Sequence, residues 1–153
     1  MSRIINDNTI RGSESVFDSG RRLGFTGTQR GMTEIQKQEF ERFVIEQNPL
    51  EFHHGDCIGS DAEAHEIVRR VLPLCVIVIH PPSNDIKRAF KKGDESRPPA
   101  PYLTRNHNII QETDFLVATP ANKEVLRSGT WATVRWYRRW KKSEPKIIYP
   151  WGV

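Results

Sequence analysis

The sequence predicts an α/β protein: a single Rossmann-like domain with a doubly wound parallel sheet of about five strands and helices on both faces. Three observations lead to this prediction. Short apolar runs alternate with segments of helical periodicity, as parallel sheets with helical crossovers require. The run LCVIVIH (74–80) is apolar on both faces, which is typical of a strand covered on both sides. Several expected strand ends carry small, polar, glycine-bearing sequences, and such ends gather along one edge in this fold class.

The expected elements alternate from strand to helix and finish on a fifth strand. They are strands over 23–26, 50–54, 74–80, 114–119 and 146–149, and helices over 34–47, 60–71, 102–111 and 129–142. Thr33 caps the first helix and Gln36 completes a capping box, while Asn48 and Pro49 end this helix. In the second helix apolar residues recur at i, i+3, i+4 and i+7 from Ala64, which gives one side facing the core.

Two segments lie outside this alternation. Residues 1–20 are polar and without periodicity, and we expect an N-terminal arm or edge element there, with the Rossmann-like domain over 21–153. Residues 81–100 are rich in proline and mixed charges. Because a loop of this length inside a compact domain is usually functional or mobile, we expect a lid or side wall of the site, the alternative being a surface insertion.

Length and composition are those of one folded domain. The chain has 153 residues, of which 37% are hydrophobic and 27% charged, enough for one buried core. No apolar run reaches the length of a membrane span, and the N-terminus has no signal-peptide pattern, so we expect a cytoplasmic protein without a membrane partner. Cys57 and Cys75 are then expected to be free thiols. The net charge of +4 favours a phosphate-bearing partner but is too small to predict nucleic-acid binding.

The stretch FTGTQR is the first candidate part of a binding site. The expected strand breaks at Gly27 just before a helix, and main-chain N–H groups at such an edge suit anionic ligands. Gly27 permits the close approach of a phosphate or ribose. Thr26, Thr28 and Gln29 can donate hydrogen bonds, and Arg30 adds positive charge. The alternative is an ordinary strand-to-helix turn.

The stretch RSGTWAT opens the last helix and is a second candidate anion site. N–H groups of its first turn, at Gly129 and Thr130, suit phosphate together with the Ser128 hydroxyl and Arg127. Thr133 lies one turn further on and faces the same way as Thr130. A plain serine N-cap is the alternative, but the presence of similar stretches elsewhere in the chain favours phosphate binding.

The stretch HHGDCIGSDAEAH follows the second strand and is the third candidate. Its predicted ligand-binding residues are His54, Gly55, Asp56 and Cys57. Asp56 can accept hydrogen bonds from ribose hydroxyls, as an acidic residue does in other dinucleotide folds. Asp61 is expected to cap or orient the loop and His65 to pack beneath it. The spacing matches no zinc pattern, so no metal is predicted.

Two further features concern the later helices. Arg105 and Asn106 stand at a helix start, where they can hold a phosphate or orient a neighbouring loop, the alternative being a surface helix with a salt bridge. On the last helix Trp136 and Trp140 share a face among several arginines. Tryptophans on a helix more often form a core or a subunit interface, so we expect a homo-oligomer. Single-stranded nucleic-acid binding through this basic helix is the less favoured alternative.

Three blocks in this order resemble the Rossmann-like domain of DNA-processing protein A. They are GDCIGSDAEAH (55–65), RNHNII (105–110) and SGTWAT (128–133), followed by a strand and YPWG. That domain belongs to the SLOG superfamily, which includes the Lonely-guy phosphoribohydrolases, molybdenum-cofactor carriers, and sensor domains for signalling nucleotides such as cyclic ADP-ribose derivatives. The resemblance covers nearly the whole chain and implies a nucleotide-like ligand bound at the strand ends.

The resemblance also bears on catalysis. Lonely-guy enzymes carry a glutamate shortly after a Pro-Gly-Gly-x-Gly-Thr segment, whereas Thr133 stands in the corresponding region here, and glycosidic cleavage needs a carboxylate. We therefore expect a sensor, carrier or sequestering protein for a nucleotide-derived ligand, with no catalytic residue assigned and no cofactor. The alternative is a nucleoside-monophosphate phosphoribohydrolase in which Glu112 or Glu124 supplies the carboxylate.

Overall fold

A six-stranded parallel sheet forms the centre of the structure, a computed structural model that describes residues 21–152. The strands are β1 (Arg22–Gly27), β2 (Glu51–His54), β3 (Val76–Ile79), β4 (Glu95–Ser96), β5 (Phe115–Thr119) and β6 (Lys146–Ile147). Their order is β4-β3-β2-β1-β5-β6, so the chain winds outward from β1 in both directions. The carboxyl ends of β1 and β5 therefore flank the point where the winding reverses, the usual place for a ligand in this architecture.

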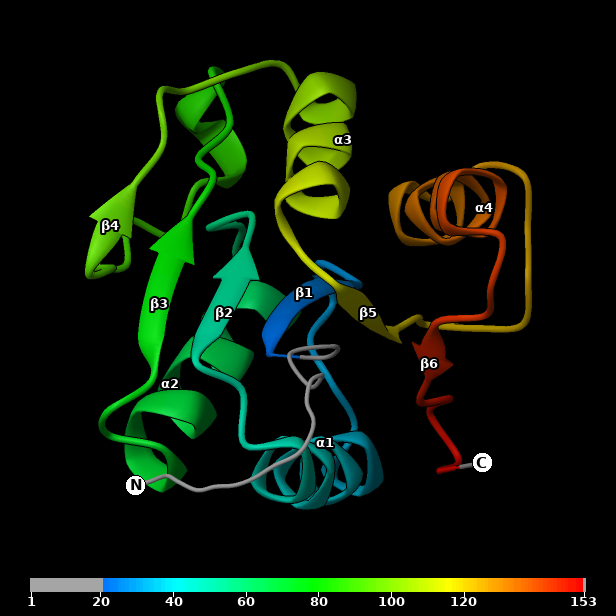
Figure 1. Cartoon of the computed structure of the whole chain (residues 1–153). Helices are drawn as coiled ribbons and strands as arrows, with labels where there is room; N and C mark the ends of the chain where they lie inside the picture. Colours follow the sequence, from blue (N-terminus) through cyan, green and yellow to red (C-terminus); the bar gives the residue numbers. More distant parts are fainter. Residues whose placement is uncertain (1–20, 153) are drawn as a thin grey trace.

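Helices cover both faces of the sheet, which confirms the predicted Rossmann-like α/β class. They are α1 (Glu34–Gln47), α2 (Ser60–Val71), α3 (Tyr102–Glu112) and α4 (Gly129–Lys141). In Figure 1, α1 and α2 lie on one side of the sheet and α3 and α4 on the other. Within residues 21–152, no helix combines the length and apolar character needed to cross a membrane. The expected arm over 1–20 lies outside the described residues.

Aromatic side chains organise the core on each face. Between the sheet and α1, the buried rings of Phe25, Phe40 and Phe52 have centroids 5.3–5.8 Å apart, and such edge-to-face and tilted contacts add to the free energy of burial. On the other face, α4 inserts Trp131 and Tyr137, which are 1% and 2% exposed. Because Trp131 lies in the first turn of α4, this burial fixes the N-terminal end of the helix against the sheet.

The predicted capping box at the start of α1 is confirmed. The Thr33 hydroxyl accepts a hydrogen bond from the Gln36 main-chain N–H at 3.1 Å, and the Gln36 side chain accepts one from the Thr33 N–H at 3.0 Å. The fully buried Gln36 amide also donates to the carbonyls of Pro120 and Ile148, each at 2.8 Å. Helix α1 is thereby tied to the chain that follows β5 and β6.

Residues 81–100 hold more structure than a loop, so the sheet has six strands instead of about five. A short 3-10 helix, η1 (Asp85–Lys87), is followed by β4, which pairs with β3 through Val78 and Glu95. Asp94, directly before β4, holds this segment against the sheet, because its carboxylate accepts a hydrogen bond from the Ile77 N–H at 2.8 Å. Both residues of β4 are exposed, so this strand has no apolar pattern that the sequence could reveal.

Candidate functional site

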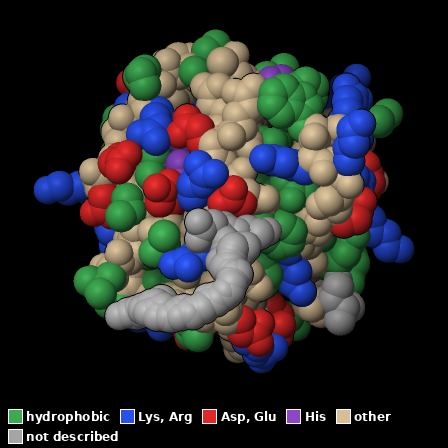
Figure 2. Space-filling view, in the orientation of Figure 1, with side chains coloured by type: hydrophobic (Ala, Val, Ile, Leu, Met, Phe, Trp, Pro, Cys, Tyr) green, Lys and Arg blue, Asp and Glu red, His purple; other side chains and the backbone are tan. Residues whose placement is uncertain are grey.

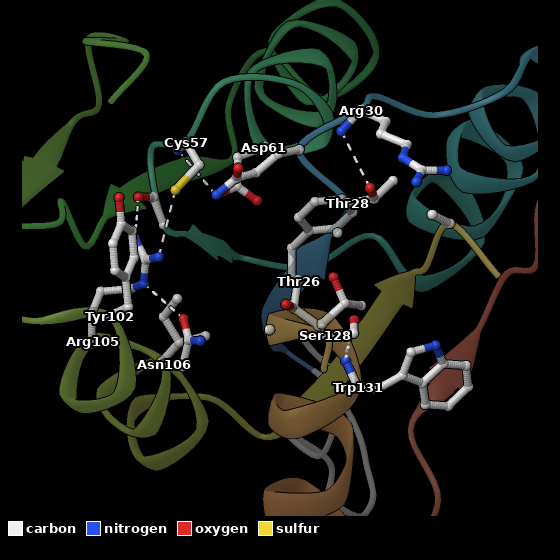
Figure 3. Close-up of a pocket in the computed structure, with 18 of the residues that line it drawn as sticks. Thr26, Thr28, Arg30, Cys57, Asp61, Tyr102, Arg105, Asn106, Ser128 and Trp131 are labelled. Carbon is white, nitrogen blue, oxygen red and sulfur yellow. Dashed lines mark hydrogen bonds between the residues drawn. The ribbon is translucent and has the colours of Figure 1, made fainter. Parts of the chain in front are cut away.

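A cavity of about 600 Å³ opens at the carboxyl edge of the sheet. Four segments line it: the end of β1 with the turn after it (25–30), the β2–α2 loop (55–61), the start of α3 (102–109), and the chain from 121 into α4 at 131. Figure 3 shows these segments facing one another across an open space. Ligand pockets of small molecules fall in this range of volumes.

Most residues that the sequence predicted for a site line this cavity. They are Thr26, Gly27, Thr28, Gln29, Arg30, Gly55, Cys57, Arg105, Asn106, Ser128, Gly129 and Thr130. They converge because parallel strands place their carboxyl ends, and the loops that follow them, along one edge. His54, Asp56 and Thr133 do not line the cavity.

The turn after β1 is held in place by its own main chain. The Thr28 N–H donates to the Thr119 carbonyl at 3.1 Å, and the Thr28 carbonyl accepts from both the main-chain N–H and the hydroxyl of Ser60, at 3.1 and 2.6 Å. A Cβ added at Gly27 would lie 2.5 Å from the Ser60 Cβ. Gly27 therefore lets α2 approach β1 closely, while the Thr28 hydroxyl is the group of this residue left to donate to a ligand.

The N-terminal end of α4 opens into the cavity. Ser128 is its N-cap, and the serine hydroxyl accepts from the Trp131 N–H at 3.2 Å. The N–H groups of Gly129 and Thr130 have no partner within the helix, because the first turn lacks preceding carbonyls. A Cβ added at Gly129 would meet nothing within 4 Å, and the first turn carries no acidic residue. The positive end of the helix dipole is thus accessible to an anion.

Arg105 clamps the loops on the opposite side of the cavity. Its side chain is 5% exposed, and its guanidinium donates to the carbonyls of Gly55 and His80, the second at 3.1 Å. It also donates to the Cys57 thiol at 3.5 Å and to the Asn106 side chain at 2.7 Å. Of the two roles that the sequence left open, orienting a neighbouring loop is the one these contacts perform.

Asp61 is a cavity residue that the sequence interpretation treated only as a loop cap. Its carboxylate does accept from the Cys57 N–H at 3.1 Å, as expected of a capping group. It also lines the cavity, and Figure 3 shows it pointing toward the open space. Burial raises the pKa of the Asp61 carboxyl to about 6, although the nearby Arg105 guanidinium opposes the shift. This carboxyl therefore exchanges its proton close to neutral pH.

Asp56, expected to contact ribose, is fully buried behind the cavity wall. One carboxylate oxygen accepts from the Arg88 guanidinium at 2.9 Å and the other from the Lys91 main-chain N–H at 2.9 Å. These bonds attach the segment around η1 to the β2–α2 loop. Because this partner comes from a segment without a helix or strand pattern, the sequence could not reveal that Asp56 was already engaged.

His54 and Thr133 also make internal contacts. His54 is buried, shares a hydrogen bond of 2.9 Å with His65, and accepts from the Asp56 N–H at 2.9 Å. Burial lowers the pKa of His54 well below its ordinary value, so it is a neutral ring that shapes the loop. The Thr133 hydroxyl donates to the Gly129 carbonyl at 2.9 Å, one turn below the open end of α4.

Two exposed arginines, Arg30 and Arg127, line the cavity from different segments. No acidic side chain within residues 21–152 forms a salt bridge with either. The two glutamates considered for catalysis lie outside the lining: Glu112 pairs with Arg97 at 2.8 Å, and Glu124 pairs with Arg135 at 3.1 Å. Asp61 is thus the acidic residue of the cavity lining, which otherwise carries positive charge.

The outer face of α4 has the aromatic character that the sequence predicted. Trp136 stacks on His107 with a centroid distance of 3.9 Å, and Trp140 is 47% exposed. Arg138, however, is bonded to both Glu124 and Glu144, at 3.2 and 3.0 Å. Its charge is therefore largely compensated before any nucleic acid arrives. The expected homo-oligomer stays a prediction.

No model of a known protein family matches the chain, and no curated protein matches it. The resemblance to the SLOG superfamily stays a prediction. A functional assignment therefore depends on the chemistry of the cavity itself.

Proposed function

We propose that the protein binds a small nucleotide-derived ligand in the cavity at the carboxyl edge of the sheet, as a sensor, carrier or sequestering protein. The observation that carries the proposal is the convergence of an open helix N-terminus, at Gly129 and Thr130, with two arginines that have no salt bridge within residues 21–152, in one cavity of about 600 Å³. An anionic ligand of nucleotide size suits both the charge and the volume.

The phosphate would be bound at the α4 end of the cavity. There it can accept hydrogen bonds from the first-turn N–H groups and the Thr28 hydroxyl, while Arg127 and Arg30 compensate its charge from the rim. The Ser128 hydroxyl already holds the helix end in place by bonding the Trp131 N–H.

The base and ribose would lie toward α3. Tyr102 offers an aromatic surface beside the Arg105 guanidinium, whose Cζ is 5.4 Å from the ring centroid. Asn106, next to it in the lining, has an amide suited to the polar edge of a base. Figure 3 shows Tyr102 and Ser128 on opposite sides of the cavity, so a ligand spanning them would present its apolar and anionic ends to matching surfaces.

A substitution at Gly129 tests the phosphate subsite without disturbing the fold. Gly129→Asp places a carboxylate where the phosphate would be bound, and an acid in the first turn is favourable for a helix. We expect this variant to keep its melting temperature and lose at least about tenfold in affinity for nucleoside monophosphates and cyclic ADP-ribose isomers. Gly129→Asn, of equal size but neutral, is the matched control. Calorimetric titrations in which no nucleotide binds the unaltered protein, or in which both variants bind equally, contradict the proposal.

Asp61 favours a second candidate function, hydrolysis of the N-glycosidic bond of a nucleoside monophosphate. Cleavage of this bond needs a carboxyl group to protonate the leaving base or to activate water. Asp61 faces the cavity and its pKa is raised to about 6, which suits proton transfer near neutral pH.

The two functions differ in the products formed. In the hydrolase, incubation with nucleoside monophosphates releases free base and ribose phosphate, and Asp61→Asn abolishes release while the nucleotide still binds. In the binding protein, the nucleotide is recovered intact after prolonged incubation and Asp61→Asn leaves the recovery unchanged. Chromatography of the reaction mixture distinguishes them.

A further inference from the structure

Three potential metal ligands meet outside the cavity. His53 on β2, His80 just after β3 and Glu112 at the end of α3 each offer a ligating atom, and these atoms all lie within 4.8 Å of one another. The two histidines are 1% exposed. None of the three lines the cavity, so the cluster is independent of the proposed ligand site. His80 and Glu112 come from outside the histidine-rich stretch, so the spacing within that stretch could not reveal the cluster.

His53 is oriented by a carboxylate. Its Nε2 atom lies 2.8 Å from a carboxylate oxygen of Glu51, which fixes the proton on Nε2 and leaves the Nδ1 lone pair directed at His80. A carboxylate that holds the second nitrogen of a ligating histidine is a recurrent feature of zinc sites.

One of the two ring nitrogens of His80 has no hydrogen-bond partner among the described residues. Its Nε2 atom lies 2.9 Å from Nδ1 of His53, but its buried Nδ1 atom has no hydrogen-bond partner among them. In the metal-free ring Nε2 donates its proton to Nδ1 of His53, so an ion bound at Nε2 would replace that proton and the ring would carry its remaining proton on the free Nδ1 atom. Two donors bound to one tetrahedral zinc ion are roughly 3.4 Å apart, so the pair would open by about 0.5 Å to admit an ion, a shift that small ring rotations can supply.

The charges around the cluster suit a divalent cation. One Glu112 oxygen accepts from the Arg97 guanidinium at 2.8 Å, which leaves the other oxygen for a metal. Glu51, Glu95 and Glu112 carry three negative charges. Two positive charges face them: Arg97 also pairs with Glu95 at 3.0 Å, and Arg105 donates to the His80 carbonyl at 3.1 Å. The balance is one negative charge around the place where the three ligands converge.

We propose that His53, His80 and Glu112 bind a divalent transition-metal ion of the zinc class. Two imidazoles and one carboxylate form a ligand set that zinc prefers, with a fourth position left for water. Glu112 is half-buried, so one of the three ligands is in contact with solvent. The metal would link β2, β3 and the C-terminal end of α3.

Two glutamine substitutions test the proposal. Glu112→Gln removes a ligand, whereas Glu95→Gln removes an equal charge that pairs with the same arginine but offers no ligand to the cluster. With the full chain stripped by a chelator, competition titration should give one zinc ion per chain. We expect Glu112→Gln to weaken zinc binding by about tenfold or more and Glu95→Gln to leave it nearly unchanged. Absence of stoichiometric binding, or equal effects of the two substitutions, overturns the proposal.

A cobalt spectrum provides a check that does not depend on any variant. Cobalt bound by nitrogen and oxygen gives visible bands without the near-ultraviolet charge-transfer band of a thiolate ligand. Such a spectrum, abolished by excess zinc, supports the site. A thiolate band would place the metal at Cys57 or Cys75 instead and would overturn the assignment. Neither outcome depends on whether nucleotides bind, because the ligands lie outside the cavity.

Discussion

The guanidinium of Arg105 occupies the space that a side chain on Gly55 would need. A Cβ added at Gly55 would lie 2.6 Å from Cζ of Arg105, which also donates a hydrogen bond to the Gly55 carbonyl. The absence of a side chain at residue 55 is therefore what allows α3 to clamp the β2–α2 loop. The shape of one wall of the cavity depends on this contact.

Gly55→Ala should destabilise the protein and weaken ligand binding together. The added methyl group displaces a buried guanidinium that makes four hydrogen bonds, and we expect a loss of about 2–3 kcal/mol in the free energy of unfolding. Gly129→Ala is the matched control, because its Cβ meets nothing within 4 Å and alanine is the better helix former. Urea denaturation of both variants measures the difference, and equal stabilities would contradict the clamp.

Asp61→Asn should stabilise the protein at pH 8 and leave it unchanged at pH 4. The folded-state pKa of about 6 lies above the ordinary 3.8, so the folded state holds a proton that the unfolded state releases. The stability that this one carboxyl contributes is therefore lost as the pH rises from about 4 to about 6. The difference of roughly two units corresponds to about 3 kcal/mol at most. Denaturant midpoints at the two pH values measure it; an identical shift at both would disprove the assignment.

Stability should decrease as the pH falls below about 6.5, because buried histidines are neutral in the folded state. Burial lowers the pKa of both His54 and His65, whereas their unfolded counterparts take up protons in this range. Without this histidine the unfolded state takes up about one proton fewer. We therefore expect His54→Asn to reduce the slope of the free energy of unfolding against pH by roughly 1.4 kcal/mol per pH unit. The comparison is best made in the Asp61→Asn background, where the opposing titration is absent, and with a chelator present. An unchanged slope would contradict a neutral His54.

Arg88→Met should be far more costly than the loss of a surface ion pair. The Arg88 guanidinium is bonded to Asp56, whose side chain has no exposed area. Removing the cation leaves a buried carboxylate without its partner, which lowers the free energy of unfolding by about 3 kcal/mol or more. Arg42→Met is the control, because Arg42 pairs with Glu39 while 63% exposed, and such pairs contribute less than about 1 kcal/mol. Chemical denaturation distinguishes a structural role of Asp56 from a direct ligand contact, since in the latter case Arg88→Met would change affinity but not stability.

The sequence predicted the fold well because its evidence is local. Periodicity identified the four helices, and Thr33 with Gln36 marked the start of α1 to the residue. The apolar run 74–80 marked β3, although the strand itself is shorter. Glycine-bearing strand ends then located the cavity, because topology alone brings such ends together.

What the sequence did not reveal depends on contacts between distant residues. The sequence predicted that Asp56 is free to bind a ligand, but its carboxylate is bonded to Arg88, which comes from a segment without a helix or strand pattern. Asp61 looked like a cap, because exposure to a cavity has no local pattern. His53 gained its neighbour His80 only through the pairing of β2 with β3. Hydrophobic periodicity encodes which face is buried, not which polar groups meet across it.

The borders of the sheet have a consequence for how copies of the protein meet. The outermost strands, β4 and β6, are two residues long, and prolines at 98–99, 145 and 150 stand close to them. Edge strands this short, with prolines beside them, have few main-chain groups available to pair with a strand of another molecule. Proteins that contain sheets use such edge strands to avoid edge-to-edge aggregation. Self-association of the described residues would therefore proceed through helical surfaces, and the exposed Trp140 on α4 is the place to look for it.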